Sequence, residues 1–430
     1  MEGRRLAATV RLLPAATALD TAAPDSFRRD AKVIGLVGVA HGLSHFFQLA
    51  LPPLFPLLKA EFDVSYAALG VLVGVFYVAS GATQFAAGFV VDRIGAVPVL
   101  LFALAAFVVA ACGLAASTHY AWLMLFAAIA GVGNAPFHPV DYSIMNERVS
   151  APRLGRAYAV HGVTGSLGWA AAPVFLVGIA QPFGWRAAAA GAGALAAVVL
   201  LVVWRHRALL EGVHRAPARE ARTAQAAGGA AYTLAFLRLP AVWLSFAFFF
   251  SWAVALGGVQ TFGPEASKAL HAVPVELAAL CVTAYMLANA GGMLVGGFLL
   301  ADPARSERMI ATGFGVAVLV ALLIGFSAVP GWSVPLLFAA MGLGAGIAGP
   351  SRDLLVKRAT PPGATGRVYG MVYSGLDVGM AVSPAAFGVM MDAGQPALVW
   401  LGIALFQGLL ILSAVNIGRV TAPRAPAGAA

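Results

Sequence analysis

The chain has 430 residues, of which 60% are hydrophobic and only 10% are charged, and its mean hydropathy is +0.86. Since a soluble domain carries roughly a quarter charged residues, this composition excludes an ordinary water-soluble protein and indicates a surface that faces lipid. The formal net charge of +9 would suggest nucleic-acid binding in a soluble chain, but basic loops of a membrane protein explain it better, so we expect no nucleic-acid partner.

Residues 1–32 are polar and basic and lack an apolar segment with a cleavage site, so we predict a cytoplasmic tail rather than a signal peptide. Apolar runs of about 20 residues or more follow, each long enough to cross a bilayer as a helix. Their continuity, without an alternation of period two, disfavours a β-barrel. The twelve runs lie at 33–58, 66–91, 96–116, 120–146, 155–181, 184–204, 240–262, 275–300, 307–328, 332–358, 364–391 and 396–418.

One long connection, residues 205–239, separates six runs from six and is rich in arginine and alanine. We therefore predict an N-terminal six-helix bundle at 33–204, a cytoplasmic linker at 205–239, a C-terminal six-helix bundle at 240–418 and a cytoplasmic tail at 419–430. The fold class is all-α, with 12 transmembrane helices in two six-helix repeats.

The basic residues predict the orientation. With the N-terminus inside, all but three of the 27 Lys and Arg residues fall on the cytoplasmic side, and the exceptions are Lys59, Arg186 and Lys268. Such an asymmetry follows the positive-inside rule. We predict a multi-pass protein of a bacterial-type inner (plasma) membrane with both termini in the cytoplasm.

The two halves repeat one another. A shift of 211 residues lays 131–173 over 342–384 with nine identities and no gap, including Gly155-Arg156 on Gly366-Arg367. Repeated six-helix halves with a substrate site at the midplane between them are typical of secondary transporters.

A short motif makes the resemblance specific. From Gly88 to Gly95 the chain reads Gly-Phe-Val-Val-Asp-Arg-Ile-Gly, which resembles the loop 2–3 signature of the major facilitator superfamily, without the basic residues that usually follow it. The resemblance implies a gate in which Asp92, beside Arg93, meets the positive start of the eleventh helix near Arg367. The alternative is an ordinary turn that ends a helix.

Two further stretches narrow the resemblance. His41 to Phe62 in the first helix, and Gly131 to Pro139 with its Phe-His-Pro in the fourth, are similar to the fosmidomycin-resistance branch of drug exporters. This branch implies efflux of a drug-like compound by an antiporter.

Polar residues within the helices are the candidate site, because an ionisable group at a helix centre costs about 2.5–3.5 kcal/mol and usually faces the bundle interior. In each of the first and fourth helices, three of them share one face at spacing i, i+4, i+7. We interpret these as substrate and proton-coupling residues, with helix–helix hydrogen bonding as the alternative. They are His41, His45, Gln48, Asn134, His138 and Asp141.

Four other residues are weaker candidates. His161 in the fifth helix lies either in the cavity or in a packing seam of glycines. Asp377 is the only acid deep in the C-terminal half and is a candidate for coupling. Arg352 and Asp353, near the cytoplasmic end of the tenth helix, are candidates for a gate or a local ion pair.

These features predict a secondary active transporter that moves a small organic or drug-like substrate by alternating access, with proton-coupled export favoured. Proton-coupled uptake of a small organic anion is the runner-up, because protonated histidines suit an anion. A sensor or scaffold without transport is the alternative from another class.

The chain lacks a nucleotide-binding loop and hydrolase motifs, so we expect no enzyme and no cofactor. Without cysteine ligands or a clear carboxylate set we also expect no metal site. Its expected partners are the substrate, protons and the lipid bilayer, and a monomer is expected.

Overall fold

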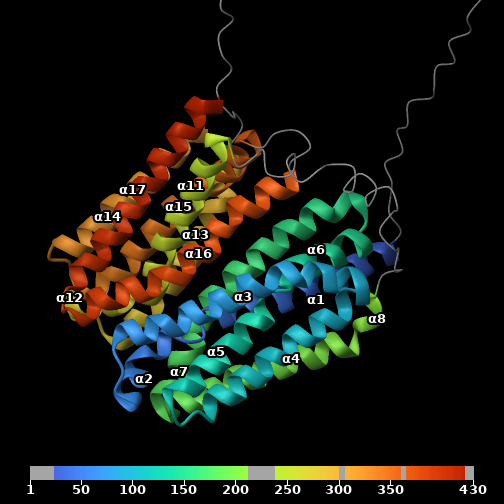
Figure 1. Ribbon diagram of the computed structural model, residues 1–430, viewed down its shortest axis with the longest axis horizontal. Coiled ribbons are helices and arrows are strands. Elements are labelled where there is room, and N and C mark those ends of the chain that lie inside the picture. Colours follow the sequence, from blue (N-terminus) through green and yellow to red (C-terminus); the bar gives the residue numbers. More distant parts are fainter. Residues whose placement is uncertain (1–23, 212–237, 300–305, 360–364, 422–430) are drawn as a thin grey trace, which may run out of the picture.

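The computed structural model describes residues 24–211, 238–299, 306–359 and 365–421, and these residues are almost entirely helical, with no strand among them. Figure 1 shows two groups of helices side by side, one running from blue to green and the other from yellow to red. The predicted all-α membrane fold is confirmed.

The first group contains the helices before residue 212, and the second group contains the helices after residue 237. The first group comprises α1 (Pro24–Gln48), a 3₁₀ turn (Pro52–Leu54), α2 (Phe55–Phe62), α3 (Tyr66–Ile94), α4 (Ala96–Ala115), α5 (Tyr120–Asn134), α6 (Phe137–Arg148), α7 (Ala151–Arg205) and α8 (Arg207–Leu210). The second comprises α11 (Pro240–Thr261), α12 (Gly263–His271), α13 (Val275–Leu299), α14 (Ser306–Phe326), a 3₁₀ turn (Gly331–Ser333), α15 (Val334–Ala359), α16 (Thr365–Asp392) and α17 (Pro396–Thr421).

Prolines interrupt two of the predicted helices. The run at 33–58 was expected to be one helix, but α1 ends at Gln48 and the chain bends by 41° before it continues through α2. The run at 120–146 is likewise divided at Pro136, between α5 and α6. Proline lacks the N–H that would continue the helical ladder, so each helix restarts beyond it. The helix α1 also begins at Pro24, so the predicted tail 1–32 is helical from there.

The longest helical element, α7, is two helices that fold back on one another. At about 1.5 Å per residue its 55 residues would span about 80 Å, well beyond a bilayer core. The backbone turns at Gly184, whose φ is +82°, and a Cβ on Gly191 would lie only 3.0 Å from Ile179. A continuous helix would separate these residues by three turns.

The number of spans depends on this reversal. Ten described helices are long and apolar enough to cross a membrane, and the bent pair of α1 and α2 makes eleven. The predicted count of twelve requires both legs of α7 to cross and stays a prediction.

The two groups meet most closely where α3 begins and α16 ends. We call this the distal side, and we call the opposite side, where α1 begins and α17 ends, the terminal side. The Asp392 carboxylate at the end of α16 accepts hydrogen bonds from the backbone N–H groups of Tyr66 (2.7 Å) and Ala67 (2.8 Å). A carboxylate from the second group thus caps the positive N-terminus of α3 in the first group.

Glycines let the same two helices touch. A Cβ on Gly70 of α3 would stand 2.3 Å from the Pro384 carbonyl oxygen, and one on Gly388 of α16 would stand 2.5 Å from the Tyr66 carbonyl oxygen. A second contact joins α13 to α7, where the Thr283 hydroxyl donates to the Ala170 carbonyl at 2.7 Å. Backbone-to-backbone packing of this kind is typical of helices in lipid, where small residues permit close approach.

The contact at Gly70 predicts a difference between two glycines of one helix. Alanine stabilises a helix interior by about 1 kcal/mol over glycine, but overpacking costs roughly 1–3 kcal/mol. Gly70→Ala should lower the melting temperature of the purified protein, because a backbone carbonyl blocks the new methyl group. Gly88→Ala is the matched control, because a Cβ at Gly88 meets nothing within 4 Å. This substitution should leave the melting temperature unchanged or raise it. Equal melting temperatures would contradict the close contact.

Candidate functional site

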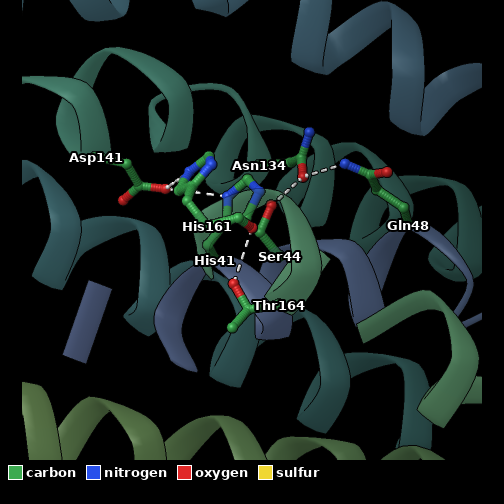
Figure 2. A network of polar contacts seen from close by, with 7 residues as sticks. All are labelled: His41, Ser44, Gln48, Asn134, Asp141, His161 and Thr164. Atoms are coloured by element: carbon green, nitrogen blue, oxygen red, sulfur yellow. Dashed lines mark hydrogen bonds and ion pairs between the residues drawn. The ribbon is translucent and has the colours of Figure 1, made fainter. Parts of the chain in front are cut away.

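A buried carboxylate organises the polar residues of the first group. Asp141 on α6 has no exposed surface, and its Oδ2 lies 3.0 Å from His41 Nδ1 on α1 and 3.0 Å from His161 Nε2 on α7. Figure 2 shows the two imidazoles converging on this one oxygen from separate helices. Both histidines are themselves buried, so three titratable groups share a site inside membrane-spanning helices.

Four imidazoles gather around this carboxylate, and we call them the histidine cluster: His41, His45, His138 and His161. The rings of His41 and His161 are stacked, with centroids 3.5 Å apart. His45 and His138 lie with their ring centroids 4.5 and 5.5 Å from that of His41. His138 is exposed in the described structure, whereas His41 and His161 are buried. His138 is therefore the member of this buried group that lies at the surface of the protein.

The local sequence explains why these side chains meet. His41 and His45 are one turn apart on α1, and His138 and Asp141 are one turn apart on α6, so each pair shares a helix face. On α7, Gly165 leaves room for the rings, since a Cβ there would lie 2.8 Å from His45 Cε1. Without that space α1 and α7 would stand farther apart and His161 would be displaced from Asp141.

A second polar network adjoins the cluster and centres on Asn134 at the end of α5. Its side-chain oxygen accepts hydrogen bonds from the Ser44 hydroxyl at 2.7 Å and from the Gln48 amide at 3.1 Å, and its amide donates to the Ser80 hydroxyl at 2.9 Å. Gln48 in turn accepts a hydrogen bond from Trp169 Nε1 at 2.9 Å. The network joins α1, α3, α5 and α7, and Figure 2 shows its Ser44–Asn134–Gln48 part.

Some polar atoms of the cluster lack hydrogen-bond partners. Asp141 Oδ1 and His45 Nδ1 are buried without one. His41 Nδ1 is at ion-pair distance from Asp141, but its geometry does not satisfy that of a hydrogen bond. Buried polar atoms are normally paired, so these atoms are available to a proton, a water molecule or a ligand.

The structure brings together seven of the eight predicted substrate and coupling residues and separates one, Asp377, from them. His41, His45, Gln48, Asn134, His138 and Asp141 lie in the two adjoining networks, and His161, which the sequence left between cavity and packing, belongs to the histidine cluster. Asp377 lies elsewhere, on α16 against Gly81 of α3, where a Cβ on the glycine would be 3.4 Å from the Asp377 Cβ.

The predicted gate stays a prediction. Arg93 is exposed near the end of α3. The side chains of Asp92, Arg352, Asp353 and Arg367 lie outside the part of the structure that is described.

Sequence reasoning missed several contributors. Ser44 follows His41 by three residues and extends the same polar face, so the helical period could have identified it. Ser80 and Trp169 carry no comparable signal, because an isolated serine or tryptophan in an apolar helix is unremarkable. Asp392 was also missed, since its role depends on a helix 326 residues away.

A cavity of about 390 Å³ lies between the two groups on the distal side. The polar residues that line it come from both groups and include Gln181, Gln260, Glu265 and Lys268. Gln260 is buried, and neither polar atom of its side-chain amide has a hydrogen-bond partner. Both groups therefore contribute polar side chains to one cavity.

Comparisons with solved structures show the fold. The nucleoside transporter NupG superposes with a TM-score of 0.71 at 15% identity, over 90% of this chain and 98% of NupG. A bacterial homologue of the human lysosomal transporter Spinster, in an inward-facing and unoccupied conformation, superposes with a TM-score of 0.67 at 16% identity, over 91% of this chain and 95% of the homologue.

Comparisons of sequence identify relatives and the family. The fosmidomycin resistance protein of Escherichia coli is 27% identical over 156 residues, which are 35% of this chain and 37% of that protein. The quinidine resistance protein 1 of Saccharomyces cerevisiae is 22% identical over 135 residues, which are 31% of this chain and 24% of that protein. The match thus spans less than half the length of either relative. The sequence profile of the Major Facilitator Superfamily matches residues 37–384 and 271–428, and the chain therefore belongs to this superfamily of membrane transporters.

Proposed function

We propose that this secondary transporter exports a small organic compound in exchange for protons, and that Asp141 with His41 and His161 carries the proton. The observation on which this rests is the carboxylate oxygen with an imidazole nitrogen at 3.0 Å on each side, inside membrane-spanning helices. The proposal follows from the chemistry of these groups and from the family.

The chemistry of the site suits proton coupling. Imidazole and carboxylate groups can each take up and release a proton, and the charge of an imidazole changes readily with its surroundings. An added proton would change the pairing between Asp141 and the two rings, and hence the fit of α1, α6 and α7. Because His138 is exposed beside the cluster, a substrate bound there would compete with the proton or favour its release.

The same proposal assigns a state to the structure. The distribution of the basic residues favours a cytoplasmic location for the terminal side. With α3 and α16 in contact on the distal side, this conformation is then the inward-facing one, as in the Spinster homologue. The Asp392 cap on α3 would hold the outer side closed. In the opposite state Asp92, at the end of α3, would play the equivalent part at the start of α16.

The substrate class rests on resemblance alone. The relatives that match part of the chain are named for resistance to fosmidomycin and to quinidine, which favours efflux of drug-like compounds. Uptake of a small organic anion is the second candidate, because protonated imidazoles would attract a negative charge.

Neutralising the carboxylate should uncouple transport. The assay uses proteoliposomes that contain a pH dye, to which candidate substrates are added one at a time. At least one of them should cause proton movement with the wild-type protein. The panel comprises fosmidomycin, other phosphonates, small carboxylates and lipophilic cations. Asp141→Asn, which keeps the size of the side chain, should abolish the proton movement while leaving exchange of the same labelled compound partly intact. The surface variant His206→Gln is the control and should behave as wild type. Full proton-coupled transport by Asp141→Asn would remove Asp141 from the coupling role.

Removing the charge at the distal contact should shift the conformation. A capping carboxylate stabilises a helix terminus by about 1–2 kcal/mol, so its loss should change the ratio of the closed to the open conformation of the distal side roughly 5–30-fold. The reporter is Gln260→Cys in a protein whose own cysteines, Cys112 and Cys281, are replaced. An impermeant thiol reagent added from the distal side should label this cysteine faster when Asp392→Asn is also present. Asp63→Asn, an exposed carboxylate on the same side, is the control. Equal labelling rates in the two variants would contradict the proposed gate.

A further inference from the structure

The histidine cluster has the composition and spacing of a metal site. His41, His138 and His161 each offer one ligand atom, and these three atoms lie within 4.8 Å of one another. Asp141 adds an oxygen 3.0 Å from a nitrogen of His41 and of His161. The four residues come from α1, α6 and α7, so the site is formed only when these three helices are packed together.

The spacing is close to that of a tetrahedral zinc site. Zinc lies about 2.0–2.2 Å from nitrogen and carboxylate oxygen ligands, which places neighbouring ligand atoms of a tetrahedron about 3.3 Å apart. The two distances of 3.0 Å to Asp141 approach this value, and the stacked rings of His41 and His161 would turn apart to face one ion. The three histidine ligand atoms lie within 4.8 Å of one another, so the rings would have to draw closer to share one ion, and His138 is an exposed residue.

An unpaired oxygen at the site supports a ligand independently of the spacing. Asp141 Oδ1 has no hydrogen-bond partner, although the residue is completely buried and the other oxygen of its carboxylate faces the two histidines. A buried carboxylate oxygen without a partner is costly, and coordination to a cation would compensate it. The sequence alone does not indicate this site, because only the tertiary structure brings His161 and Asp141 beside the other two histidines.

We propose that His41, His138, His161 and Asp141 bind one Zn²⁺ ion at the centre of the first helix group. Three imidazoles with one carboxylate select zinc over calcium or magnesium, which prefer oxygen ligands. Binding rests on these four residues and not on the proposed transport activity. Because the ion occupies the atoms assigned to the proton, it would also inhibit proton-coupled transport.

The test uses the purified full-length chain in detergent, without a polyhistidine tag and after treatment with a chelator. Co²⁺ should bind with one ion per chain and give the intense visible absorption of tetrahedral cobalt, and one equivalent of Zn²⁺ should remove it. His138→Gln and His161→Gln should each weaken Zn²⁺ binding by at least about tenfold. His138 is exposed, so its replacement is expected to fold, and Zn²⁺ should raise the melting temperature of the wild type but not of this variant.

Matched controls are the exposed histidines at the ends of the helices. His119→Gln and His206→Gln should retain the wild-type affinity and cobalt spectrum. The proposal is overturned by the absence of a tetrahedral cobalt spectrum in the wild type, or by unchanged Zn²⁺ binding in both cluster variants. Because these measurements need no substrate, a failure of the transport assay leaves the metal result unaffected.

Discussion

The pairing of Asp141 with two histidines is the interaction on which the first helix group depends. A carboxylate with no exposed surface inside a membrane-spanning helix is tolerated only when other groups compensate its charge. Here one imidazole comes from α1 and the other from α7, so compensation requires both helices to approach α6. The glycines of α7 follow from the same requirement, because a side chain at Gly165 would occupy the space of the rings. The compensation of the Asp141 charge therefore depends on the close packing of α1 and α7 against α6.

The contact between the two groups has a different physical basis. On the distal side, backbone atoms of α3 and α16 touch through glycines, and the Asp392 carboxylate satisfies two N–H groups at the start of α3. The repeated halves suggest why such a contact can be exchanged for another. The helices α3 and α16 run in opposite directions, and each has an acid near its end, Asp92 and Asp392. We propose that Asp92 closes the terminal side in the opposite state, as Asp392 closes the distal side in this one.

The carboxylate and imidazole atoms that would exchange a proton in the proposed mechanism are also atoms that coordinate zinc. Both proposals start from the same contacts, and the two occupants would exclude one another. The Asn134 network adjoins this centre with neutral polar groups, whereas the separate distal cavity is lined by charged as well as neutral side chains. The two proposals are therefore linked through Asp141.

The sequence by itself determined the class of the protein, because composition, apolar run lengths and basic loops depend on the chain and the bilayer alone. It also identified the polar faces of the first and fourth helices, since helical period is local. It could not show that Pro52 and Pro136 divide these helices, that His161 belongs with Asp141 rather than with the packing glycines, or that Asp377 does not. The fold class and most members of the site were thus predictable. Which members touch, and which side of the molecule closes, was decided only by the tertiary structure, because those contacts join residues tens to hundreds of positions apart.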